Sequence, residues 1–385
     1  MRNPQKRGSV AIVGAAESDL GVVAPGMTPL DLMAQGISRA LDDCGLTLKD
    51  IDGVFASTAQ ARAPTLSLCE YLQIRPRYHD SSNSGGSVFE SMVMHAQAAI
   101  EAGMCEVAVI AYGSTQRSAS GKLISTRGYD PFLSPYELRM PASAYALAAA
   151  RHIHQYGTTR EQLAEVAVAA RQWALKNPVA WEKAPLTINE VLGARMVSTP
   201  LGVRDCCLVT DGGGAVILTS SERARTLRRQ PVYVLAAADA ISHNEIHSMR
   251  DLTVTAAAES GAAAYRIAAV NASDVDVAQL YDAFTINTIL FLEDLGFCAK
   301  GEGGPFVEDG GIAPGGRFPV NTNGGGLSYC HPGMYGLLLL IEAVRQLRGE
   351  CGERQVQGAE IAIAHGSGGT LSSQATVILG TPSTL

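Results

Sequence analysis

The chain has 385 residues, of which 46% are hydrophobic and only 17% are charged, so it can bury a large core in one large or two medium domains. The net charge of −7 and the lack of a basic tract argue against a general role in nucleic-acid binding. No apolar run reaches membrane-spanning length, and the apolar stretch near the N-terminus is too short for a signal-peptide core.

Apolar runs of strand length alternate with segments of helical periodicity in the first half. In chain order, the predicted elements are a strand at 10–13, a helix at 29–44, a strand at 52–56, a helix at 87–102 and a strand at 107–111. Gly45 directly follows the first helix and is a typical helix stop. This alternation predicts a parallel sheet covered by helices.

The second half repeats the pattern of the first. Residues 231–237 resemble residues 9–15, residues 273–276 resemble 49–52, and residues 360–366 resemble 106–113. Three pairs of similar segments in the same order predict an internal duplication. We therefore expect two halves, at 1–225 and 230–385, with a helical insertion at 114–200 in the first half.

Three glycine-rich motifs follow one another near the C-terminus. Residues 321–326 read Asn-Thr-Asn-Gly-Gly-Gly, residues 331–336 read His-Pro-Gly-Met-Tyr-Gly, and residues 365–369 read His-Gly-Ser-Gly-Gly. This series resembles the C-terminal active-site half of the thiolase superfamily. The resemblance implies an α/β thiolase-like fold, in which two duplicated βαβαβ-type halves form an α-β-α-β-α layered core. It also implies that the insertion covers the active site and contacts the substrate.

The two cysteines of thiolase chemistry are absent from the matching positions. In thiolases a nucleophilic Cys opens a helix in the first half, and a second Cys precedes the last glycine-rich loop. The first position reads Gly86-Ser87 here, and the second reads His365. Ser87 can attack a thioester only with a base beside it, and its alternative role is a helix cap. Backbone N–H groups at this helix start, including that of Gly86, can still bind an oxyanion.

Two further motifs carry candidate catalytic side chains. Residues 281–284 read Tyr-Asp-Ala-Phe and resemble the thiolase motif Asn-Glu-Ala-Phe, which places Tyr281 where the family holds an oxyanion water through Asn. A buried phenol can transfer a proton or donate to an oxyanion, and the alternative is a core tyrosine with a satisfied hydroxyl. His331 matches the His of the family's Gly-His-Pro motif, with Cys330 in place of Gly, and the resemblance implies that it donates to the thioester oxygen.

The remaining candidates are weaker. Tyr329 is a second candidate for proton transfer, although packing is its more ordinary role. His365 can serve as an auxiliary acid or base at neutral pH, or be a loop histidine bonded to backbone. Gly326, Gly368 and Gly369 belong to loops that the resemblance assigns to substrate and oxyanion binding.

A conspicuous segment at 205–215 reads Asp-Cys-Cys-Leu-Val-Thr-Asp-Gly-Gly-Gly-Ala and resembles a thiolase segment with a structural role near the dimer interface. The neighbouring Cys206 and Cys207 are too close for an ordinary disulfide, and the pair alone does not predict a metal site. The chain has eight scattered cysteines and no CxxC pair, so we expect no zinc ribbon, no bound metal and a reduced, cytoplasmic protein.

The motifs resemble most closely the lipid-transfer-protein-like branch of sterol-carrier-type thiolases that lack the nucleophilic Cys. The residues that carry this resemblance are 85–87, 112–114, 151–159, 205–213 and 325–333. Some members of that branch are aldolases that cleave the β-hydroxyacyl-CoA side chain of a steroid to a ketone and a short acyl-CoA. A retro-aldol step needs a base for the β-hydroxyl and donors for the enolate, but no acyl-enzyme.

The resemblance also implies partners. We expect an acyl-CoA substrate, no tightly bound cofactor, a homodimer, and a separate OB-fold protein with a zinc ribbon as accessory partner. Two alternatives stay open: an acyltransferase, such as an acetyl-CoA C-acyltransferase with a displaced Cys, and a non-catalytic lipid-transfer-type subunit.

Overall fold

The computed structural model describes residues 5–120 and 131–385, and these residues form a nine-stranded sheet in the order β3-β2-β4-β7-β1-β8-β11-β10-β9. A short hairpin, β5 and β6, lies apart from it. The strands are β1 Val10–Glu17, β2 Gly53–Ser57, β3 Tyr78–Asp80, β4 Val107–Ser114, β5 Met196–Ser198, β6 Leu201–Gly202, β7 Gly212–Ser220, β8 Val232–Ile241, β9 Val277–Leu280, β10 Ile361–Gly368 and β11 Ser373–Gly380.

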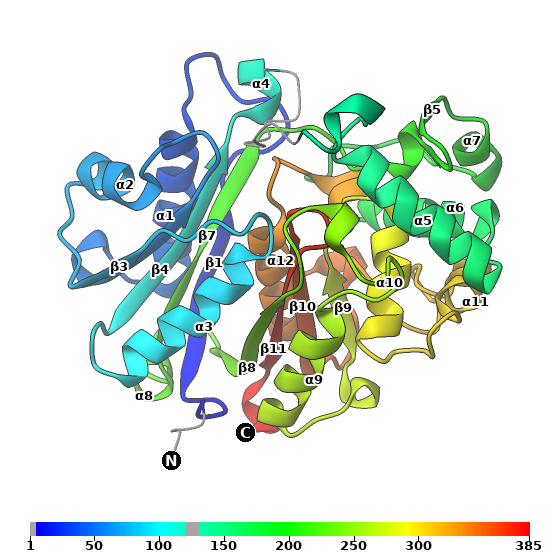
Figure 1. Ribbon diagram of the computed structural model, residues 1–385. Coiled ribbons are helices and arrows are strands. Elements are labelled where there is room, and N and C mark those ends of the chain that lie inside the picture. Colours follow the sequence, from blue (N-terminus) through cyan, green and yellow to red (C-terminus); the bar gives the residue numbers. More distant parts are fainter. Residues whose placement is uncertain (1–4, 121–130) are drawn as a thin grey trace.

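The helices lie on both faces of this sheet (Figure 1). They are α1 Pro29–Cys44, α2 Pro64–Leu72, α3 Val88–Glu101, α4 Gln116–Ser120, α5 Ala142–Tyr156, α6 Arg160–Leu175, α7 Ile188–Leu192, α8 Ser221–Ala224, α9 Ala257–Ala268, α10 Thr285–Asp294, α11 Gly303–Val307 and α12 Gly336–Arg348. Among the described residues, no helix is both long and apolar enough to cross a membrane.

The sheet consists of two halves that meet between β1 and β8. This central pairing is short and joins Ala11 to Tyr233 and Ile12 to Val232. Helices α3 and α12 lie between the two halves and pack on both, whereas α1 covers the outer face of the first half and α9 that of the second (Figure 1). The expected α-β-α-β-α layering of a thiolase-like fold is therefore confirmed.

A repeated hydrogen-bond pattern marks the duplication. Asp52 accepts from the backbone N–H groups of Glu106 and Val107, at 2.8 and 2.9 Å. Asp276 accepts in the same way from Glu360 and Ile361, at 2.8 and 2.9 Å. Each aspartate thus joins the start of one strand to the strand beside it, at matching places in the two halves. The boundary near residues 225–230 stays a prediction.

The expected parallel sheet is wrong, because the sheet is mixed. The β2 strand pairs in parallel with β3 and β4, and β9 pairs in parallel with β10, but all other pairings in the large sheet are antiparallel. The reversal lies in the last strand of each half: β7 follows the insertion and β11 follows a short turn after β10, and each runs antiparallel to both of its neighbours. Strand-helix-strand alternation describes only the earlier strands of each half.

Local sequence determines the helices that position the site. Helix α1 has the predicted bounds, because Thr28 and Asp31 form a capping box before it and Gly45 ends it with a φ of 78°. Helix α3 starts after Gly85, whose φ is 82°. A Cβ on Gly85 would lie 2.7 Å from the backbone nitrogen of Gly369. The start of α3 therefore lies directly against the last glycine-rich loop.

Candidate active site

A cavity of about 1080 Å³ opens where the two halves and the insertion meet. The described residues that line it come from the start of α3, the insertion, the segment before β7, the loop after β8, the turn after β9, the His-Pro-Gly turn, and the facing ends of β10 and β11 with their loop. They include Asn83, Gly85, Gly86, Tyr145, Val197, Cys206, Cys207, Val209, His243, Tyr281, Phe284, His331, Met334, Ser367, Gly369, Thr370 and Ser373. The expected contribution of the insertion is visible in Pro141, Ala142, Tyr145 and Val197, whereas residues 121–130 of the insertion lie outside the described residues.

Tyr281 occupies the space that a side chain at position 86 would need. A Cβ built on Gly86 would collide with the Tyr281 ring and would lie 2.6 Å from the phenol oxygen. Tyr281 itself is buried, with 4% of its surface exposed. The phenol therefore lies where the thiolase resemblance expects the nucleophilic thiol, and glycine at position 86 makes room for it.

Tyr281 and His331 form a direct pair in the cavity. The phenol oxygen is 3.2 Å from Nε2 of His331, and the two rings meet edge to face. The backbone N–H of Tyr335 donates to the same oxygen at 3.1 Å. The sequence predicted both side chains as site residues, and the structure brings them together.

Burial keeps both partners of this pair neutral. It lowers the pKa of His331 to about 4 and raises the pKa of Tyr281 well above its ordinary value. Nδ1 of His331 has no hydrogen-bond partner among the described residues. Nδ1 is also buried, so the ring nitrogen that can react is Nε2, and a neutral imidazole can accept the phenol proton there.

Asp282 fixes the turn that carries His331. Its Oδ1 accepts from the backbone N–H of Gly326 at 2.6 Å, and its Oδ2 accepts from that of Leu327 at 3.3 Å. Burial raises the pKa of this carboxyl to about 7. Gly326 was expected to bind substrate, but its N–H group is directed at Asp282 and the residue does not line the cavity.

The other glycines and Ser87 form the floor behind the cavity. Gly369 lines the cavity, and its carbonyl accepts from the Tyr145 hydroxyl at 3.3 Å, whereas Gly368 packs against the backbone of Ser84. Ser87 is fully buried and donates to Ser373 at 2.9 Å. Its side chain makes no capping bond and has no basic partner among the described residues, so the geometry provides no means to activate it.

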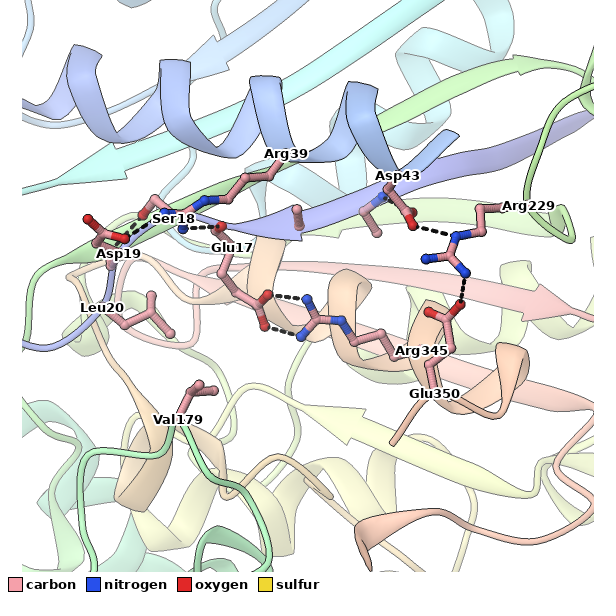
Figure 2. A pocket seen from close by; sticks show the side chains of 12 residues that line it. Glu17, Ser18, Asp19, Leu20, Arg39, Asp43, Val179, Arg229, Arg345 and Glu350 are labelled. Atoms are coloured by element: carbon pink, nitrogen blue, oxygen red, sulfur yellow. Dashed lines mark hydrogen bonds and ion pairs between the residues drawn. The ribbon is translucent and has the colours of Figure 1, made fainter. Parts of the chain in front are cut away.

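Tyr329 lies outside the cavity, on the side of a second cleft of about 840 Å³. Its hydroxyl donates to Glu17 at 2.9 Å, and Glu17 pairs with Arg345. Figure 2 shows this cleft, in which Glu17 and Arg345 face each other and Asp43, Arg229 and Glu350 form a chain of ion pairs. The structure thus gives Tyr329 a structural contact rather than access to substrate.

His365 is also outside the cavity. It lies on β10, fully buried, with its two ring nitrogens 2.9 Å from Thr376 Oγ1 and 3.0 Å from Gln374 Oε1, and its ring contacts Phe291. Burial lowers the pKa of His365 to about 3. The structure places it as a satisfied core histidine, bonded to side chains rather than to backbone.

This placement predicts a pH-dependent difference between the protein and its His365→Gln variant. The imidazole must stay neutral in the folded chain but takes up a proton near pH 6.5 when unfolded. Its contribution to stability is therefore complete above pH 6.5 and is lost as the pH falls toward about 3. Chemical denaturation should show a destabilised variant at pH 8, by about 1–3 kcal/mol, and a shrinking difference at pH 5. A difference that does not depend on pH would contradict the assignment.

Several cavity residues were missed by the sequence analysis. Cys206 and Cys207 line the cavity because the backbone of Cys207 pairs with that of Ala283, beside Tyr281, at 2.8 Å. Burial raises the pKa of Cys206 to about 12 and that of Cys207 well above its ordinary value, so both remain thiols. Tyr145 stacks on Phe284 at 4.3 Å between ring centroids and closes one wall. No local signal marked these contacts, which join segments far apart in the chain.

Comparisons with known proteins agree with this architecture. Residues 238–381 match the family model described as thiolase C-terminal domain-like. The chain is 35% identical to an acetyl-CoA acetyltransferase of Methanothermobacter thermautotrophicus, over 94% of this chain and 96% of that protein. It is also 35% identical to a 17-hydroxy-3-oxo-4-pregnene-20-carboxyl-CoA lyase of Mycobacterium tuberculosis, over 89% and 92%. The solved structure of an Ltp2-ChsH2(DUF35) aldolase superposes with a TM-score of 0.90 and 31% identity, over 98% of this chain and 99% of that chain.

Proposed function

The chain belongs to the thiolase superfamily, in its sterol-carrier-type branch, and on this premise we propose that it is a carbon–carbon lyase acting on an acyl-CoA thioester. The observation that carries the proposal is the position of Tyr281, which fills the place of the thiolase nucleophile and contacts His331. Relatives of similar identity include both a lyase and an acetyltransferase, so the site chemistry has to discriminate between them.

The reaction that fits this site is a retro-aldol cleavage of a β-hydroxyacyl-CoA. The phenol oxygen of Tyr281 takes the β-hydroxyl proton while the phenol passes its own proton to Nε2 of His331. The bond between Cα and Cβ breaks, Cβ becomes the carbonyl carbon of a ketone or aldehyde, and the electron pair enters the thioester as an enolate. The enolate then takes a proton at Cα, which restores the pair and releases a shorter acyl-CoA.

The enolate oxygen needs hydrogen-bond donors that face the cavity. Nδ1 of His331 is buried and has no partner among the described residues, so the imidazole would donate to that oxygen through Nε2 once Nε2 has taken the phenol proton. The backbone N–H groups at the start of α3 lie beside Gly86 and add the positive end of the helix dipole.

The cavity suits a bulky, steroid-like acyl group. Its walls include Val197, Val209, Phe284, Met334 and the ring of Tyr145. None of its described lining residues is a lysine or an arginine, so the cavity is suited to the neutral acyl part of the substrate rather than to the phosphates of CoA.

We propose two protein partners as well. A separate OB-fold, zinc-ribbon protein is supported by the similar Ltp2-ChsH2 structure, whose name includes a DUF35 component beside the aldolase. A homodimer is supported by the open edge of the sheet at β3, which can pair with a second copy.

An acyltransferase is the second candidate, because Cys206 and Cys207 line the cavity. Their raised pKa values oppose thiolate formation, and neither makes a contact with His331 that could activate it.

A panel of β-hydroxyacyl-CoA and β-ketoacyl-CoA thioesters should be assayed with and without free CoA, and with and without the DUF35-type partner. The lyase predicts cleavage of β-hydroxyacyl-CoA without free CoA; thiolysis predicts cleavage of β-ketoacyl-CoA only with it. Binding without turnover in every arm would indicate a non-catalytic subunit.

A further inference from the structure

A buried carboxyl lies directly behind the floor of the cavity. Glu90 is in the first turn of α3, one turn after Gly86, and only 1% of its surface is exposed. Neither carboxyl oxygen has a hydrogen-bond partner among the described residues. Burial raises its pKa well above the ordinary value, and only its own backbone N–H opposes this shift. An unpaired carboxyl that is costly to bury calls for a functional explanation.

Two glycines make room for this carboxyl. A Cβ on Gly366 of β10 would lie 2.6 Å from the carboxyl carbon of Glu90, and a Cβ on Gly336, the first residue of α12, would lie 2.9 Å from its Oε1. The same Cβ on Gly336 would also collide with the carbonyl oxygen of Gly86. The carboxyl therefore lies beside Gly86, and the Tyr281 ring packs against the cavity side of the same glycine.

The carboxyl lies where the N-termini of two helices converge. Glu90 is the third residue of α3, and Gly336 begins α12. The Tyr335 N–H, directly before α12, donates to the phenol oxygen of Tyr281. Each helix N-terminus acts as roughly half a positive charge. Both therefore favour the negative charge that develops on the enolate oxygen in the proposed reaction, and they help to hold the phenol oxygen that moves the proton.

No charged group among the described residues compensates Glu90. On the elements packed against α3, and on the turns that flank Gly86, the titratable side chains are Tyr112, Tyr233, Asp239, Tyr281, Asp282, His365, Tyr335, Glu342, Arg345 and Arg348. None of them is a cause of the pKa shift of Glu90. His365 adjoins Gly366 in sequence, but successive residues of a strand face opposite sides of the sheet, and the His365 ring contacts Phe291 instead.

We propose that Glu90 is a positioning residue that acts through its charge. The neutral carboxyl leaves the positive ends of both helix dipoles available to the reacting oxygens, whereas the ionised carboxyl neutralises those positive ends and inactivates the site. The inference rests on the proposed lyase function for its catalytic consequence. The protonation state itself can be measured without any substrate.

The first test is infrared spectroscopy of the protein and its Glu90→Gln variant at pH 7. We expect the carbonyl stretch of a protonated carboxyl in the unaltered protein and its loss in the variant. Asp282→Asn and Asp294→Asn identify the contributions of two other carboxyls whose pKa burial raises. If Glu90→Gln does not fold, Glu90→Leu removes the same acid. No loss of the band in either variant would mean that Glu90 is already ionised and would overturn the proposal.

The second test is the pH dependence of kcat/KM for the cleaved thioester. In the unaltered protein it should fall about tenfold per pH unit above the pH at which the Glu90 band disappears. Glu90→Gln should lack this alkaline decline. Glu342→Gln is the matched control: Glu342 is also a buried glutamate of the central layer, but it pairs with Arg354, so its loss should keep the shape of the profile. An unchanged decline in Glu90→Gln would overturn the proposal, whereas failure of every thioester to react would instead contradict the lyase function.

Discussion

Tyr281→Phe should lower kcat for cleavage of a β-hydroxyacyl-CoA by about 10²–10⁴-fold, the usual contribution of a positioned acid or base. The substitution keeps the ring that fills the space at Gly86 but removes the oxygen that contacts His331 and the Tyr335 N–H. KM should change much less, because the apolar walls remain. Steady-state kinetics with the best thioester of the panel measure both parameters.

Tyr329→Phe is the matched control for this experiment. It also removes one buried phenol oxygen, but that oxygen donates to Glu17 outside the cavity. We expect kcat within a few-fold of the unaltered value and a loss of about 1 kcal/mol in the free energy of unfolding. If Tyr281→Phe kept full activity, or if Tyr329→Phe lost it, the assignment of the proton-transfer residue would be wrong.

Gly86→Ala should have the second large effect. The added Cβ would collide with the Tyr281 ring, and the backbone at the start of α3 leaves it little room to move. Overpacking of this kind typically costs about 1–3 kcal/mol of stability, and displacement of the phenol from His331 should lower kcat about 10²-fold or more. Thermal or chemical denaturation and the lyase assay measure the two consequences.

Double variants identify the clash as the cause. Gly86→Ala combined with Tyr281→Phe should be no slower than the slower single variant, because both remove the same phenol contact. Gly86→Ala combined with Tyr281→Ala should be more stable than expected from the sum of the single changes, since the ring that collides is gone. Strict additivity in both pairs would show that Gly86 and Tyr281 do not share this space.

Local patterns in the sequence were sufficient for much of the fold. Helix α1 was predicted to the residue because its cap, its apolar periodicity and its terminal glycine all lie within the segment. The mixed direction of the sheet was not predicted, since the pairing of β7 and β11 depends on contacts between distant segments. On β10, the direction in which each side chain points decides its role. His365 faces the outer layer, whereas its neighbour Gly366 faces Glu90.

The sequence predicted those residues of the site that belong to recognisable motifs. Tyr281 and His331 were identified from two separate motifs, and their contact across 50 residues of chain follows from the fold. Glu90 belongs to none of the motifs identified in the sequence, and the glycines that make room for its carboxyl lie in other segments. Only the folded chain therefore shows that this carboxyl has no partner among the described residues. Cys206 and Cys207 were identified as a segment of structural importance, but their place in the cavity depends on the pairing with Ala283.

The most direct test of the central claim is a single-turnover reaction of the preferred β-hydroxyacyl-CoA in D₂O without free CoA, followed by mass spectrometry of products and protein. A retro-aldol cleavage by the Tyr281–His331 pair predicts a ketone or aldehyde, a shorter acyl-CoA carrying deuterium at Cα, and a protein of unchanged mass. Cleavage that requires free CoA and a β-ketoacyl-CoA, with an acyl group bound to the protein, would contradict it and would identify a thiol nucleophile.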